Sequence, residues 1–208
     1  MMPPGTIILS STEYTRFNVF QAHLMRVLRE TPGASLSWNV GVDIAANLND
    51  AIRRATGEWV WIIGDDHTFE GNIIERLWAH EVDVVVPLVL QRFAPHRMVL
   101  YHADETPLAV GATDRGLISV GLAGSAGMLI RRHVLDAVGD PWFTVAGVER
   151  QSEDIGFCKK VNHVGLRIYC DLDTHMGHLT TLEVWPTWDA QTGQWRVSYK
   201  QTNVSRLL

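Results

Sequence analysis

The first 90 residues alternate between short apolar runs and segments in which apolar side chains recur at helical spacing. The run at 59–63, Trp-Val-Trp-Ile-Ile, is typical of a strand buried on both faces. From Phe17 to Leu28 the apolar positions fit an amphipathic helix, which Pro32 and Gly33 end. The expected strands are 6–10, 36–39, 59–63 and 82–90, and the expected helices are 17–28, 44–55 and 73–78. This alternation predicts a parallel sheet with helices on both faces and a ligand site at the edge where its strands end.

The second half of the chain has a weaker and more mixed pattern. Residues 91–116 are mostly irregular, with a short antiparallel strand expected at 98–102. The other expected elements are strands at 117–120, 128–130, 167–171 and 195–199 and helices at 132–138 and 155–164, the last preceded by Ser152 as its cap. No repeat, low-complexity segment or linker separates the two halves. The pattern therefore predicts one α/β domain over residues 1–208.

Composition narrows the class of protein. With 208 residues, 46% hydrophobic and 20% charged, the chain has the size and content of one globular domain. Its net charge of −5 weighs against binding nucleic acid mainly by phosphate neutralisation. Cys158 and Cys170 stand in apolar surroundings and are expected to be reduced core thiols. Because no apolar run approaches the roughly 20 residues of a membrane helix, and residues 1–5 lack signal-peptide features, a soluble cytoplasmic protein is expected.

Two groups of acidic and histidine side chains follow predicted strands. Asp65 and Asp66 stand at the end of the apolar run at 59–63, where adjacent carboxylates repel each other and a divalent cation would compensate them. A simple capping pair is the alternative. After the strand at 167–171, four potential ligands lie within eight residues: Asp171, Asp173, His175 and His178. Imidazole together with carboxylate suits Mn²⁺ better than Mg²⁺.

Glu153 and Asp154 open the predicted helix at 155–164. Acidic residues in a first helical turn often do no more than complement the helix dipole. Alternatively, the helix N-terminus holds Asp154 as a general base. The sequence leaves both interpretations open.

Taken in order, these features resemble the GT-A glycosyltransferases, particularly the compact family-2-like members. The matching segments are 6–11, 47–59, 62–66, 124–132, 141–143, 153–158 and 177–179. The resemblance implies a single GT-A (Rossmann-like) α/β domain, with a mixed, mostly parallel central sheet flanked by helices and a small antiparallel second half. It divides the chain into a nucleotide-binding half at 1–90, an acceptor half at 91–180 and a C-terminal tail at 181–208.

The family's Asp-x-Asp motif falls on Gly64, Asp65 and Asp66, so a glycine replaces its first carboxylate. In relatives with this form, the last Asp touches the metal and the preceding one contacts the ribose or supports a water ligand. The resemblance therefore implies a Mn²⁺ or Mg²⁺ ion held by Asp66 and His178, with Asp65 on the nucleotide side.

The resemblance also implies a reaction, the transfer of a hexose or similar sugar from a nucleotide diphosphate sugar, a UDP-sugar above all, to an acceptor hydroxyl. The nucleoside is expected near five residues at the first strand end and the second helix: Ser10, Ser11, Thr12, Glu13 and Asn47. The sugar and acceptor are expected near the small-residue stretch and an aromatic ring: Gly124, Ser125, Ala126 and Trp142. Asp154 matches the base of inverting relatives, with Glu153 beside it; in a retaining enzyme the two would instead hold hydroxyl groups.

Other functions fit parts of the sequence. A serine hydrolase would use Ser125 in Gly124-Ser125-Ala126-Gly127, but a strand-like segment follows where a nucleophile elbow needs a helix. A metal-dependent phosphoesterase would join Asp65, Asp66 and His67 to the 171–178 cluster as a two-metal site. A nucleotide-sugar-binding protein without catalysis is a third possibility. The acceptor is open among glycans, lipids, small molecules, proteins and modified nucleobases.

Eight tryptophans exceed the six phenylalanines and four tyrosines. Those of the first half are expected in the core: Trp38, Trp59, Trp61 and Trp78. The others fall in the acceptor half or the tail, where some are expected to line the acceptor site: Trp142, Trp185, Trp188 and Trp195.

Overall fold

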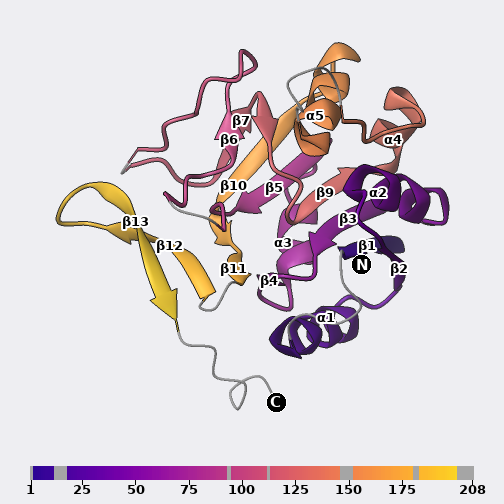
Figure 1. Cartoon of the computed structure of the whole chain (residues 1–208), viewed down its shortest axis with the longest axis horizontal. Helices are drawn as coiled ribbons and strands as arrows, with labels where there is room; N and C mark the ends of the chain where they lie inside the picture. The colour runs from indigo at the N-terminus through magenta and orange to yellow at the C-terminus, as the bar shows by residue number, and fades with distance from the viewer. Residues whose placement is uncertain are drawn as a thin grey trace.

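A computed structural model describes residues 2–11, 18–92, 95–111, 113–145, 152–179 and 183–200. Figure 1 shows one α/β body from which a hairpin near the C-terminus extends. The helices are α1 (Asn18–Glu30), α2 (Ile44–Arg53), α3 (Ile73–Trp78), α4 (Arg132–Val138) and α5 (Glu153–His163). All five begin and end within a few residues of the helices expected from the sequence.

The central sheet has seven strands in the order β2-β1-β3-β9-β5-β10-β7. They are β1 (Gly5–Ser11), β2 (Ala34–Val40), β3 (Trp59–Gly64), β5 (Val84–Leu88), β7 (Leu117–Val120), β9 (Met128–Arg131) and β10 (Ile168–His175). The neighbours β2, β1 and β3 are parallel, as predicted. However, β9 lies antiparallel between β3 and β5, so the second half of the chain completes the sheet that the first half begins. The mixed, mostly parallel sheet of the predicted fold class is confirmed.

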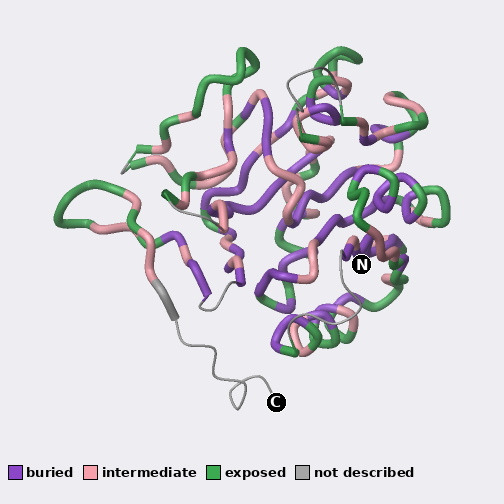
Figure 2. Tube along the Cα trace, viewed as in Figure 1, coloured by how far each residue is buried: buried purple, intermediate pink, exposed green. Residues whose placement is uncertain are grey.

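Helices cover both faces of this sheet, and the alternation of side chains along β3 shows how. Val60 and Ile62 pack with α2, α4 and α5, whereas Trp61 and Ile63 pack with α1 and α3. Because both faces are covered, nearly every residue of β3 is buried (Figure 2). The two apolar layers hold the strands in place, and with them the carboxyl ends at which the candidate site lies.

A second, antiparallel sheet stands beside this edge, in the order β13-β12-β11-β4. Its strands are β4 (His67–Thr68), β11 (Gly177–Leu179), β12 (Glu183–Asp189) and β13 (Gln194–Lys200). Gly177 permits the close pairing of β11 with β4, because a Cβ there would lie 2.4 Å from Thr68 Oγ1. The sequence predicts β13 but not its partner β12. A further pair, β6 (Leu100–Tyr101) and β8 (Leu122–Ala123), lies against the core.

The polar side chain of Asn49 ties α2 to the segment after α4. It is buried, donates to Phe143 O at 2.7 Å and accepts from Phe143 N at 3.0 Å. We expect Asn49→Ala to lower the free energy of unfolding in urea by about 2–4 kcal/mol, because two buried backbone groups lose their partner. Asn162→Ala removes one exposed bond to Gly121 O and should cost less than about 1 kcal/mol. Equal losses for the two variants would contradict this assignment.

Two predictions about core residues have different outcomes. Cys158 and Cys170 are buried and free, as expected, and burial raises the pKa of the Cys158 thiol to about 12. Trp38 is expected in the core, but its side chain is 50% exposed on β2, the edge strand of the sheet. Trp59 and Trp61 are fully buried. None of the helices in the described ranges is both long and apolar enough to cross a membrane.

Candidate functional site

The candidate site begins where β1 and β3 end. From β1 the chain goes to β2 on one side and then to β3 on the other, so the crevice at their carboxyl ends is a topological switch point, the usual ligand position in open α/β sheets. Ser11, at the end of β1, donates a hydrogen bond to the Asp65 carboxylate just after β3. Ser10 and Asp65 line a cavity of about 270 Å³ at this point.

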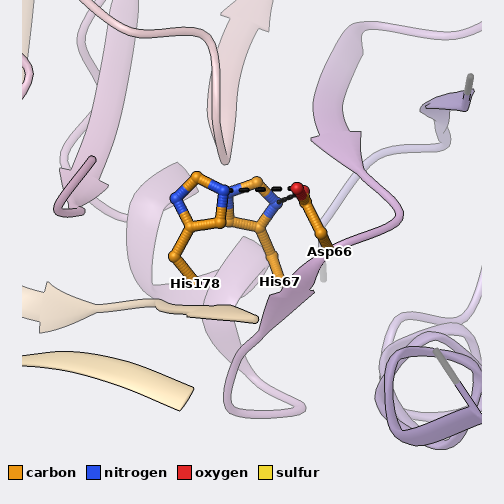
Figure 3. Close-up of side chains that lie close together, drawn as sticks. All are labelled: Asp66, His67 and His178. Carbon is orange, nitrogen blue, oxygen red and sulfur yellow. Dashed lines mark hydrogen bonds and ion pairs between the residues drawn. The ribbon is translucent and has the colours of Figure 1, made fainter. Parts of the chain in front are cut away.

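Asp66, His67 and His178 converge beside this crevice (Figure 3). Asp66 and His67 follow β3 directly, and His178 comes from β11, where it pairs with His67 across the small sheet. The Asp66 carboxylate lies 3.0 Å from His67 Nδ1 and 3.3 Å from His178 Nε2, and the two imidazoles stack at 4.4 Å. One donor atom from each residue lies within 4.8 Å of the others, so the three could hold a metal ion.

Charge at this cluster is balanced by a fourth side chain, Arg92. Its Nη1 lies 2.7 Å from Asp66 Oδ2, the same oxygen that His178 approaches. Although burial alone would raise the pKa of the Asp66 carboxyl, hydrogen bonds to His178 and His67 hold it far below its usual range. Asp66 is therefore a carboxylate at any ordinary pH.

The acidic and histidine residues near the end of β10 do not form one site, which corrects the expected four-ligand cluster. Asp171 is buried and accepts hydrogen bonds from Thr174 Oγ1 and His80 Nε2. His175 contacts Leu172 O through its Nε2. Since β10 changes register after Asp171 and the chain then enters β11, only His178 reaches Asp66. Because the other three potential ligands do not reach Asp66, the two-metal site of the alternative phosphoesterase is not assembled.

Two cavities meet at the cluster and share four lining residues: His67, Arg92, Ser125 and Ala126. The smaller contains Ser10, Asp65 and Glu153. The larger, about 630 Å³, contains Asp154 and His178. The adjacent carboxylates at the start of α5 thus point to different cavities.

Asp154 is held in place by its own helix terminus. Its Oδ1 accepts hydrogen bonds from Ser152 Oγ and, at 2.7 Å, from Ile155 N. Its Oδ2 lies 3.6 Å from the position that a Cβ on Gly124 would occupy. Ser152 is the N-cap residue of α5, as expected, but its hydroxyl bonds Asp154 rather than a backbone N–H of the helix.

The Glu153 carboxyl has a raised pKa, because burial disfavours its charged form and Asp154 and Asp43 add like charge. An acid whose pKa is raised by folding costs stability once the pH is high enough to ionise it. We expect Glu153→Gln to raise the melting temperature by about 2 °C at pH 7, and the gain to disappear toward about pH 3, where the carboxyl is protonated in both states. A gain independent of pH, or one shared by the exposed Glu81→Gln, would contradict this cause.

Some predicted site residues lie elsewhere. The Asn47 side chain donates to Gly41 O and lines neither cavity. Trp142 packs partly against the core, donates to Leu135 O and also lines neither cavity. Thr12 and Glu13 lie outside the described residues. Ser10, Ser11 and Asp65 are brought together as expected, and so are the small-residue stretch and Asp154: Gly124, Ser125, Ala126 and Asp154.

The family model for glycosyl transferase family 2 matches residues 35–139, about half of the chain, from β2 to the end of α4. The protein belongs to glycosyl transferase family 2. This glycosyltransferase shares its fold with A197 from STIV, whose crystal structure aligns with a TM-score of 0.59 over 95% of this chain and 94% of that one, at 12% identity. No curated protein sequence matches it.

The sequence does not assign two residues of this candidate site to a glycosyltransferase. His67 enters only the phosphoesterase alternative, although it stands directly after Asp66. Arg92 lies in a segment with no pattern, and only the folded chain brings it to Asp66. The strand after Ser125, β9, confirms that the serine lacks the helix of a nucleophile elbow.

Proposed function

We propose that this family-2 glycosyltransferase moves a sugar from a nucleotide diphosphate sugar, a UDP-sugar above all, to an acceptor hydroxyl, with inversion and with Asp154 as the base. One observation carries the proposal: the Asp66, His67 and His178 cluster lies where two cavities meet, and the cavities contain Glu153 and Asp154 respectively. A transferase for two substrates needs such a pair of adjoining spaces.

The smaller cavity suits the donor. Its polar groups stand at the switch point, where Asp65, held by Ser11, is available to a ribose hydroxyl. Arg92 lies on the shared wall and can meet the diphosphate as it leaves, since a guanidinium pairs well with phosphate oxygens. Glu153 lines the same cavity, where it would accept a hydrogen bond from a hydroxyl group of the sugar.

The cluster beside this cavity fits a divalent cation. Besides the close spacing of the three side chains, His67 Nε2 is buried and has no hydrogen-bond partner among the described residues, as expected for a donor atom left for a ligand. Two imidazoles and a carboxylate favour Mn²⁺ over Mg²⁺. Bound by Asp66, His67 and His178, the ion would neutralise negative charge on the diphosphate leaving group.

The surroundings of Asp154 support the proposed role of general base. Among the described residues, Ser152 and Ile155 both donate to its Oδ1, which fixes the carboxylate, while Oδ2 lies beside Gly124 in the larger cavity. There Asp154 would take the proton of the acceptor hydroxyl as its oxygen attacks the anomeric carbon. The new carbon–oxygen bond forms as the bond to the diphosphate breaks, and the nucleoside diphosphate leaves with the electron pair.

A thermal-shift panel tests donor recognition. Nucleotide sugars carrying uridine, guanosine and thymidine are compared with and without Mn²⁺ on the wild-type protein. We expect a UDP-sugar with Mn²⁺ to raise the melting temperature by about 5 °C or more at a hundredfold excess over its Kd. No shift with any nucleotide sugar, in either condition, would contradict the proposal.

A further inference from the structure

The larger cavity, like the smaller one, is lined in part by aliphatic side chains. Besides the polar groups near the cluster and the base, its lining contains six aliphatic or proline side chains: Val86, Pro87, Val89, Leu90, Val99 and Leu100. None of its described lining residues carries a Phe, Tyr or Trp ring, the surface on which sugar rings stack. Hydroxyl groups of a hydrophilic glycan would find no hydrogen-bond partner among these six side chains.

The apolar wall reaches the base itself. A Cβ placed on Gly124 would lie 2.9 Å from Val99 Cγ1 and 3.6 Å from Asp154 Oδ2. A Val99 methyl group and the Asp154 carboxylate therefore both lie beside Gly124 in the lining of the same cavity. A ligand whose hydroxyl group meets Asp154 can place part of its carbon skeleton against Val99.

The volume of the cavity is sufficient for one small molecule. About 630 Å³ is in the range of small-molecule sites, roughly 300–1,000 Å³, which combine an apolar lining with a few polar groups that orient the ligand. The cavity thus has the dimensions and the polarity of a site for a single amphipathic molecule.

We infer that the acceptor is a small hydroxy compound with an apolar carbon skeleton, whose hydroxyl group meets Asp154 and whose skeleton fills the space along Val99. This inference rests on the proposed function for the transfer step. The binding of the acceptor to the cavity does not depend on it.

Binding of a series of linear alcohols tests the inference without the donor. Calorimetry or ligand-observed NMR compares 1-butanol, 1-hexanol and 1-octanol with methyl glucoside on the wild-type protein. We expect affinity to rise about fourfold per methylene, because each buried CH₂ contributes about that factor, and methyl glucoside to bind more weakly than 1-octanol. Affinity that does not change with chain length, or stronger binding of the glucoside, would overturn the inference.

Two valine variants locate the binding. Val99→Asn places an amide in the cavity wall and should lower 1-octanol affinity about tenfold or more. Val164→Asn, which makes the same change at an exposed position after α5, should leave the affinity unchanged. Equal affinities for the two variants would place the alcohol outside this cavity and overturn the inference.

Transfer assays separate this inference from the proposed function. If alcohols bind along Val99 but no nucleotide sugar binds or reacts, the proposed function fails and the apolar site stands. If a nucleotide sugar is consumed and maltose is a better acceptor than 1-octanol, the proposed function stands and the inferred acceptor class is wrong.

Discussion

Replacing Asp66 with alanine should abolish Mn²⁺-dependent binding of a UDP-sugar and lower the transfer rate at least about 10²- to 10³-fold. The imidazoles of His67 and His178 and the guanidinium of Arg92 all contact the Asp66 carboxylate. Its removal takes away the anion that these three side chains share. Calorimetric titration of UDP with and without Mn²⁺ measures the effect directly.

A matched control keeps the Asp66 result interpretable. Asp104→Ala removes an exposed carboxylate that bonds only its own turn at Thr106, so this variant should bind UDP and Mn²⁺ like the wild type. Asp66→Asn retains the shape of the side chain and tests whether any loss comes from misfolding. If Asp66→Asn melts normally and still binds UDP more tightly with Mn²⁺ than without, the metal site is elsewhere.

Replacing Asp154 with asparagine should lower the transfer rate by about 10²- to 10⁴-fold and leave donor affinity unchanged. The amide keeps the hydrogen bond from Ile155 N but cannot take a proton from the acceptor. Rates with saturating donor and acceptor, together with the Kd of UDP, separate chemistry from binding.

Glu153→Gln provides the comparison for this variant. Glu153 lies in the donor cavity, so its substitution should change donor affinity more than the rate at saturation. If Asp154→Asn transfers sugar at the wild-type rate while Glu153→Gln does not, the roles of the two carboxylates are reversed. If both variants lose the same large factor in rate and both bind the donor more weakly, the two carboxylates hold hydroxyl groups and Asp154 is not the base.

The parallel part of the fold could be predicted because its signals are local. Each strand from β1 to β3 is an apolar run, and the helices between them have apolar faces of helical period. The position of β9 could not be predicted in this way, because its pairing with β3 and β5 joins segments more than 40 residues apart. Nothing in the composition of Met128–Arg131 distinguishes an inserted strand from an edge strand.

The candidate metal cluster of Asp66, His67 and His178 shows a similar limit. Asp66 and His178 could be matched through the family resemblance, and the structure brings them to 3.3 Å. Closeness in sequence was misleading for Asp171 and His175, because the register shift in β10 and the entry into β11 turn them to other partners. Spacing along a chain predicts a common site only where the backbone keeps one regular geometry.

The most direct test of the proposed glycosyl transfer is to identify what the wild-type protein releases from a UDP-sugar in the presence of Mn²⁺. We expect free UDP, formed with an acceptor or slowly by transfer to water, and almost none from Asp66→Ala. Release of inorganic phosphate or UMP with no free sugar or sugar adduct would show cleavage at phosphorus instead and contradict glycosyl transfer.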